Sequence, residues 1–201
     1  IPAPDENGNP EEGGISYAEY FLNPFLSSLE KIGVIPEVVM NHEIYEQGKF
    51  AKKIDTAINK KEEIREIIER ISGRELPQDW FPYSPIGPNG SMDGVKVTDY
   101  EKPYVFWIDE NGIEGKSDIN KAEGKLPWRI DWAARWGIHG ITSEPAGKDH
   151  GSAGGSYDTG IPICRLLGSE PPKKMVYEWI QIKGMGPMSS SKGVTIGPVE
   201  A

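Results

Sequence analysis

A serine-rich stretch near residue 190 has the residue types of a phosphate-binding loop. Its sequence is Met188-Ser189-Ser190-Ser191-Lys192-Gly193. Hydroxyl and backbone N–H groups donate hydrogen bonds to phosphate oxygens, and a lysine ammonium adds a positive charge. A strand-like run over 176–183 leads into the stretch, and open α/β sheets bind ligands at the carboxyl ends of their strands. We therefore expect the stretch to grip phosphate; a flexible Ser/Gly linker is the alternative.

A second candidate loop has the sequence Gly147-Lys148-Asp149-His150 and continues into the glycine-rich segment 151–155. It lies between a predicted strand over 141–145 and a predicted helix over 156–167. Backbone N–H groups exposed at the start of such a helix can bind an anion or a ribose. Asp149 could accept hydrogen bonds from sugar hydroxyls, and His150 could donate to a substrate. An ordinary strand-to-helix loop is the alternative, but a neighbouring phosphate loop in the same parallel sheet favours a ligand site.

Two tryptophans, Trp128 and Trp132, are spaced to lie one turn apart on a predicted helix over 127–136. Such pairs belong to a protein core more often than to a site. Their functional use would be one wall of a pocket for a cation, with Asp131 nearby as the negative charge. Tyr177, on the strand that follows, could complete that pocket.

Composition narrows the class of protein. The formal net charge of the 201-residue chain is −9, which argues against a diffuse basic surface for nucleic acid. The single cysteine excludes an intrachain disulfide and any multi-cysteine metal site, and it fits a reducing, cytoplasmic setting. No apolar run approaches the roughly 20 residues that span a bilayer, so we expect no membrane partner.

Alternation of helices and strands predicts an α/β fold with a parallel sheet, flanking helices and a small inserted β module. Residues 1–14 read as a mobile leader, 15–76 as the part of the α/β domain before the insert, 77–125 as the insert and 126–201 as the part after it. The remaining expected elements are a helix over 16–32 that begins with a Ser16/Glu19 capping box, a strand over 36–40, helices over 42–48 and 50–72 with Gly73 closing the second, and short strands over 95–98 and 104–108.

Several ordered motifs resemble class I lysyl-tRNA synthetases, the form typical of archaea and some bacteria. The resemblance runs from about residue 15 to the end of the chain. The matching stretches are Ser16-Tyr17-Ala18-Glu19-Tyr20-Phe21-Leu22-Asn23-Pro24-Phe25, Gly73-Arg74-Glu75-Leu76-Pro77, Gly124-Lys125-Leu126-Pro127-Trp128-Arg129-Ile130-Asp131-Trp132-Ala133-Ala134-Arg135-Trp136, Pro145-Ala146-Gly147-Lys148-Asp149-His150, Gly154-Gly155-Ser156-Tyr157-Asp158-Thr159-Gly160, Tyr177-Glu178-Trp179-Ile180 and 188–193.

The resemblance implies a catalytic domain with a Rossmann-like nucleotide-binding fold, in which 15–76 is part of the first half and 126–201 is the second half. It also implies ATP-dependent activation of lysine to lysyl-adenylate and its transfer to tRNA, with Mg²⁺ accompanying the ATP. It assigns the lysine pocket to Trp128, His150, Tyr177 and Asp131. It assigns the nucleotide side to Gly147, Asp149, Gly154, Gly155 and Met188. It assigns the catalytic signature loop, which grips the triphosphate, to Ser189, Ser190, Ser191 and Lys192.

The chain also departs from the family pattern. The first signature, of the His-Ile-Gly-His type, is absent, and Pro187 stands where many class I enzymes carry a lysine. No cysteine pairs occur in the insert, so we expect no structural zinc, and its turns at Asn89-Gly90 and Asn111-Gly112 must hold without one. We read the chain as an incomplete nucleotide-binding fold without the anticodon-binding region of the family. We therefore expect the isolated chain to aminoacylate tRNA weakly or not at all.

Two alternatives remain open at this point. The first is a non-catalytic α/β scaffold or partner-binding remnant of a synthetase. The second is a class I synthetase for glutamate or arginine, although a pocket of aromatic and acidic side chains suits a long cationic substrate better than an anionic one. The sequence leaves the oligomeric state open.

Overall fold

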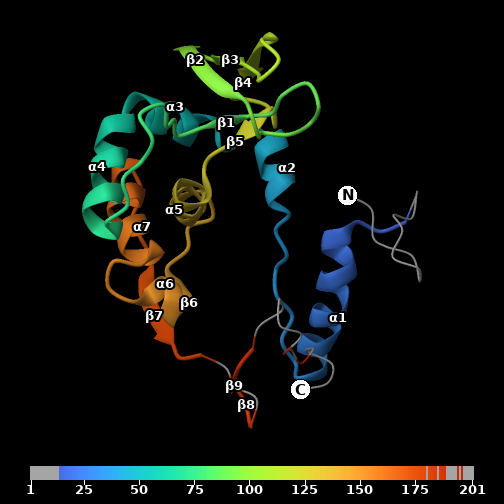
Figure 1. Ribbon diagram of the computed structural model, residues 1–201. Coiled ribbons are helices and arrows are strands. Elements are labelled where there is room, and N and C mark those ends of the chain that lie inside the picture. Colours follow the sequence, from blue (N-terminus) through green and yellow to red (C-terminus); the bar gives the residue numbers. More distant parts are fainter. Residues whose placement is uncertain (1–13, 180, 185, 189–193, 195, 197–201) are drawn as a thin grey trace. The chain divides into compact units, whose positions relative to one another are not determined.

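The computed structural model describes residues 14–179, 181–184, 186–188, 194 and 196, so the predicted leader lies almost wholly outside it (Figure 1). The chain divides into two compact units. One contains residues 1–39 and 180–201, and the other contains residues 40–179. The boundaries predicted from the sequence at 76–77 and 125–126 stay predictions.

The first unit contains helix α1, Tyr17–Lys31, which begins as the sequence predicts. The Glu19 N–H donates to the Ser16 hydroxyl at 3.2 Å, and the Ser16 N–H donates to the Glu19 carboxylate at 2.9 Å. At the other end Gly33 adopts a φ of +77°, which lets the Val34 N–H reach back to the Leu29 carbonyl at 2.9 Å. The capping box and the glycine stop are therefore both confirmed.

The strand predicted over 36–40 is wrong, because residues 34–40 belong to no helix or strand. Val38 and Val39 are 44% and 45% exposed. A strand exists only through hydrogen bonds to a neighbouring strand, and none of the described strands pairs with this segment. The same unit contains a short hairpin, in which β8 (Gln181–Ile182) pairs antiparallel with β9 (Gly186–Pro187).

The second unit begins with three helices: α2 (Asn41–Glu46), α3 (Ala51–Asn59) and α4 (Lys61–Ser72). The single helix predicted over 50–72 breaks at Lys60, whose φ and ψ are −117° and 29°. Just before the break the Asn59 side chain donates to the Asp55 carbonyl at 2.8 Å and so competes for a helical acceptor. Gly73, with a φ of +67°, ends α4 as predicted.

The site-bearing part of this unit combines two parallel strands with three helices. Strand β6 (Ser143–Gly147) pairs parallel with β7 (Lys173–Tyr177), in a register that places Gly147 opposite Tyr177. Helices α5 (Trp128–Ile138), α6 (Lys148–Gly151) and α7 (Ser156–Leu166) accompany them. The α/β class is confirmed, although parallel pairing within the described residues is limited to these two strands, and the strand predicted over 176–183 is divided between β7 and β8.

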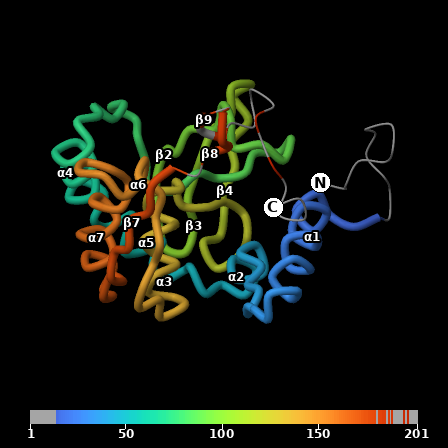
Figure 2. Tube along the Cα trace, turned by 90° about the horizontal axis from the view of Figure 1, so that it is seen from below, coloured from blue at the N-terminus to red at the C-terminus, as the bar shows by residue number. Residues whose placement is uncertain are grey.

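Helix α7 packs against both α4 and α5 (Figure 1 and Figure 2). The helices approach closely at Gly160, because a β-carbon there would come within 2.7 Å of the Trp136 ring. Trp136 and Tyr157 meet at a centroid distance of 4.9 Å, and both are buried. This aromatic contact joins α5, which carries Trp128, to α7, which begins directly after the predicted nucleotide-side residues Gly154 and Gly155.

The predicted β module contains five strands: β1 (Ser84–Pro85), β2 (Lys96–Glu101), β3 (Tyr104–Ile108), β4 (Glu114–Asp118) and β5 (Gly124–Lys125). Strands β2, β3 and β4 form an antiparallel sheet, and β1 pairs with β5. Chain reversals occur at both predicted Asn-Gly pairs. In each pair the glycine, Gly90 or Gly112, adopts a positive φ but the asparagine does not. Neither is therefore a type I′ turn, which needs a positive φ at both residues.

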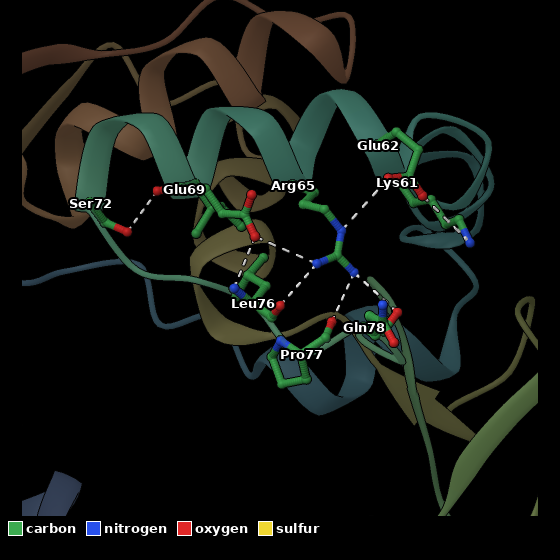
Figure 3. Close-up of polar contacts among 9 residues, drawn as sticks. Lys61, Glu62, Arg65, Glu69, Ser72, Leu76, Pro77 and Gln78 are labelled. Carbon is green, nitrogen blue, oxygen red and sulfur yellow. Dashed lines mark hydrogen bonds and ion pairs between the residues drawn. The ribbon is translucent and has the colours of Figure 1, made fainter.

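Arg65 on α4 anchors the segment that leads into this module (Figure 3). Its guanidinium donates to the Leu76 carbonyl at 3.1 Å and the Pro77 carbonyl at 2.9 Å. Glu62 and Glu69 flank the guanidinium at 3.6 and 3.5 Å. Glu69 also accepts from the Leu76 N–H at 2.9 Å, so one helix face fixes both polar groups of that residue.

Two side-chain contacts tie other segments to the helices. Asp55 on α3 accepts from the Tyr100 hydroxyl and the Lys102 ammonium, each at 2.7 Å, and so holds the β2 edge of the module. Tyr45 on α2 donates to Asp131 on α5 at 2.6 Å and accepts from the Leu126 N–H at 3.1 Å. Both Tyr45 and Asp131 are 6% exposed.

We expect Tyr45→Phe to lower the free energy of unfolding by about 1–3 kcal/mol, because it leaves a buried carboxylate oxygen and the Leu126 N–H without their partner. Urea unfolding measures the change. Tyr104→Phe is the matched control, since that tyrosine is 36% exposed and its replacement keeps the ring beneath Lys116. Equal stability of the two variants would contradict the role given to Tyr45.

Stability below pH 4 should depend on Asp55. Hydrogen bonding to Lys102 lowers the pKa of Asp55 from its ordinary value of 3.8. A carboxylate with a lowered pKa in the folded state contributes stability that is fully present above the unfolded pKa and is lost as the pH falls through the folded pKa. Unfolding free energies measured from pH 6 downwards should therefore fall less steeply in Asp55→Asn than in the wild type. Asp93→Asn, which replaces an exposed carboxylate in the β module, should keep the wild-type slope.

Candidate functional site

Three tryptophans lie in a row along helix α5, which we call the stack: the Trp128 and Trp132 rings are stacked, and the Trp136 ring is tilted by 57° against Trp132. The ring centroids of Trp128 and Trp132 are 5.7 Å apart, and those of Trp132 and Trp136 are 5.1 Å apart. Trp128 is 50% exposed, whereas Trp136 is 1% exposed. The stack therefore runs from the surface into the core: Trp136 is a core residue, and Trp128 presents a ring that a ligand can reach.

His150 on α6 lies edge-on against the outer part of this stack. Its ring centroid is 5.3 Å from that of Trp128 and 6.0 Å from that of Trp132. Its Nδ1 lies 3.3 Å from the Ser156 hydroxyl, and its Nε2 lies 3.4 Å from an Asp149 carboxylate oxygen. The structure thus brings together Trp128 and His150, two of the four residues predicted for the lysine pocket.

The segment between α6 and α7 needs its glycines. Gly154 adopts a φ of +76°, and its N–H donates to the Asp158 carboxylate at 3.1 Å. A β-carbon at Gly155 would collide with the His150 carbonyl oxygen and would lie 2.8 Å from that of Ser152. Gly155 immediately precedes α7, so the chain passes tightly beneath His150 before it enters the helix. Glycine allows this close approach of backbone to backbone.

Tyr177 lies at the carboxyl end of β7, opposite Gly147. Its ring comes within 3.7 Å of the place where a Gly147 β-carbon would stand, and the side chain is 52% exposed. No ring contact joins Tyr177 to Trp128 or His150 within the described residues. Tyr177 is therefore placed beside the start of α6, and its contact with the substrate stays a prediction.

Asp131 faces away from the outer stack. Its Oδ1 accepts from the buried Tyr45 hydroxyl, and its Oδ2 lies 2.7 Å from Nε of Arg135. Burial, followed by the Asp131 charge, raises the pKa of Tyr45 well above its usual range. The sequence-based prediction that Asp131 binds lysine is untested, but both carboxylate oxygens already have partners inside the protein.

The phosphate loop predicted at Ser189, Ser190, Ser191, Lys192 and Gly193 lies outside the described residues. Met188 is described and is 37% exposed, but it belongs to the unit that contains residues 180–201. The predicted apposition of this loop and the Asp149-His150 segment therefore stays a prediction.

Two charged residues near the stack were missed by the sequence analysis. Arg129 places its guanidinium 5.6 Å from the Trp128 ring and donates to the Thr159 hydroxyl at 3.2 Å. Glu144 on β6 accepts from the Trp132 indole N–H at 2.9 Å. Burial, with a further contribution from the Glu144 charge, raises the pKa of Tyr157 to about 12. The available signal was the position of Glu144, three residues before Gly147 in a predicted strand.

The described residues contain no group of three or more His, Cys, Asp or Glu side chains arranged to hold a metal ion. Among the helices of the described chain, none has the length and apolar character needed to cross a bilayer.

Comparisons with known proteins identify the family of the chain. The family model described as "tRNA synthetases class I (K)" matches residues 1–201. Lysine–tRNA ligase of Thermoplasma volcanium is 42% identical over 198 residues, and that of Archaeoglobus fulgidus is 43% identical over 190 residues. These alignments cover 98% and 94% of this chain but 38% of each relative, so the chain spans well under half of the relatives' length. Lysine–tRNA ligase of Methanosarcina barkeri is 45% identical over 185 residues, which are 90% of this chain and 34% of the relative. The chain belongs to the family of class I tRNA synthetases (K).

Proposed function

We propose that this chain carries the lysine-activating site of a lysine–tRNA ligase. One observation carries the proposal: the half-exposed Trp128 ring meets His150 directly above the glycine-rich entry to α7. An aromatic face suits the alkyl chain and ammonium of lysine, and a strand-to-helix loop suits a nucleotide. The names of the relatives, all lysine–tRNA ligases at 42–45% identity, support the same substrate.

In the proposed reaction the lysine carboxylate attacks the α-phosphorus of ATP, and pyrophosphate leaves. Trp128, His150 and Tyr177 hold the amino acid. Gly147, Asp149, Gly154, Gly155 and Met188 form the nucleotide side. The serine-rich loop, with Ser189, Ser190, Ser191 and Lys192, neutralises charge on the leaving pyrophosphate, and Mg²⁺ enters with the ATP. Such a site accelerates the reaction by positioning the reactants and by stabilising developing charge.

The remaining partner is tRNA, which receives the lysyl group. The net charge of −9 supplies little general attraction for nucleic acid, so tRNA contacts in this chain would be local. We place the reaction in the cytoplasm, because the single cysteine, Cys164, is unpaired and buried, as suits a reducing compartment.

The proposal predicts selective binding of a non-hydrolysable lysyl-adenylate analogue. Trp128→Ala or His150→Ala should weaken that binding at least about 10-fold, because each removes one of the two rings that meet at the site. Isothermal titration calorimetry measures the dissociation constants. His139→Ala, at the far end of α5, should bind as the wild type does. A wild-type chain that ignores the analogue, ATP and lysine would support the scaffold alternative instead.

Aminoacylation by the 201-residue chain alone should be weak or absent, because the chain spans about 38% of the relatives' length and lacks a His-x-Gly-His sequence. Formation of lysyl-tRNA from radiolabelled lysine tests this expectation. Robust charging by the pure chain would show that the remaining segments are dispensable.

A further inference from the structure

The carboxylates around the aromatic stack differ in what neutralises them. Asp131 faces Arg135, Asp158 accepts from Lys174, and Glu178 pairs with Lys148. Asp149 lies beside His150. Glu144 differs from all of these, because its contact within the described residues is a hydrogen bond from the neutral Trp132 indole.

The lysine across the sheet from Glu144 is already engaged. Lys174 lies opposite Glu144 in the parallel register, but its ammonium donates to the Gly151 carbonyl and to Asp158, each at 2.8 Å. Glu144 is also half-buried, and burying a negative charge without a cation is unfavourable. A ligand ammonium placed beside Glu144 would relieve that cost.

The charged residues along the stack match the two ends of an activated lysine, which is negative at its carboxylate or phosphate and positive at its side-chain ammonium. At the exposed end, Arg129 lies beside Trp128 and can attract a carboxylate or phosphate. One helical turn further, or about 6 Å along α5, Trp132 touches both His150 and Glu144. The Trp132 side chain therefore contacts both the predicted amino-acid side, at Trp128 and His150, and a carboxylate that no cation pairs with among the described residues.

We propose that Glu144 is the specificity-determining residue for the lysine side chain: its carboxylate receives the ε-ammonium, while the methylene groups run along the Trp128 and Trp132 rings. The inference rests on the proposed function and extends it, because it assigns the residue that distinguishes lysine from an uncharged amino acid of the same length. The same carboxylate repels glutamate.

The variant Glu144→Gln tests this proposal, because glutamine can still accept from the Trp132 indole but carries no charge. Calorimetric titration of the 201-residue chain uses two probes, the non-hydrolysable lysyl-adenylate analogue and its norleucyl counterpart. The wild type should prefer the lysyl probe by about 10- to 100-fold, as expected for a charged hydrogen bond. Glu144→Gln should lose most of this preference and bind the norleucyl probe within about two-fold of the wild type. Glu114→Gln, an exposed glutamate in the β module, should retain the full preference.

Three results would overturn the inference. If Glu144→Gln keeps the wild-type preference for the lysyl probe, Glu144 does not read the ammonium, and the proposed function stands. If it loses both probes equally and unfolds at a lower temperature, Glu144 only supports the fold. If the wild type binds neither probe, the proposed function and this inference fail together.

Discussion

The indole of Trp132 is the contact on which the candidate site depends. It meets the rings of Trp128, His150, Trp136 and Tyr157, and it donates its N–H to Glu144. Side chains from α5, α6, α7 and β6 therefore converge on one rigid ring. Such a ring loses little conformational entropy when a ligand binds, which makes it a suitable floor for a small-molecule site.

Helix α5 can present this ring because its other face is fixed in the core. Tyr45 and Arg135 hold Asp131, and the Tyr45 hydroxyl also accepts from the backbone just before the helix begins. The close approach at Gly160 then brings α7 against Trp136. One face of α5 thus stabilises the fold through Asp131, and another presents Trp128 and Trp132 to the proposed substrate.

Local signals in the sequence predicted much of the fold. The Ser16/Glu19 box, the Gly73 stop and the spacing of Trp128 and Trp132 each depend on residues within one or two turns, and the structure has the same features. The failures involve contacts between distant segments. Residues 36–40 have strand-forming side chains but no partner strand in the described part of the chain, and the stretch 176–183 is divided between two pairings. The engagement of Asp131 by Tyr45, 86 positions away, could not be read from local spacing either.

In the proposed site the amino acid lies against Trp128 and His150, and the nucleotide lies over the glycine-rich entry to α7. A crystal structure of the chain with the lysyl-adenylate analogue tests it most directly. We expect the lysyl moiety to lie between the Trp128 and His150 side and Glu144, and the adenosine to lie beside Gly154 and Gly155. An analogue bound elsewhere, with an empty Trp128–His150 face, would contradict it.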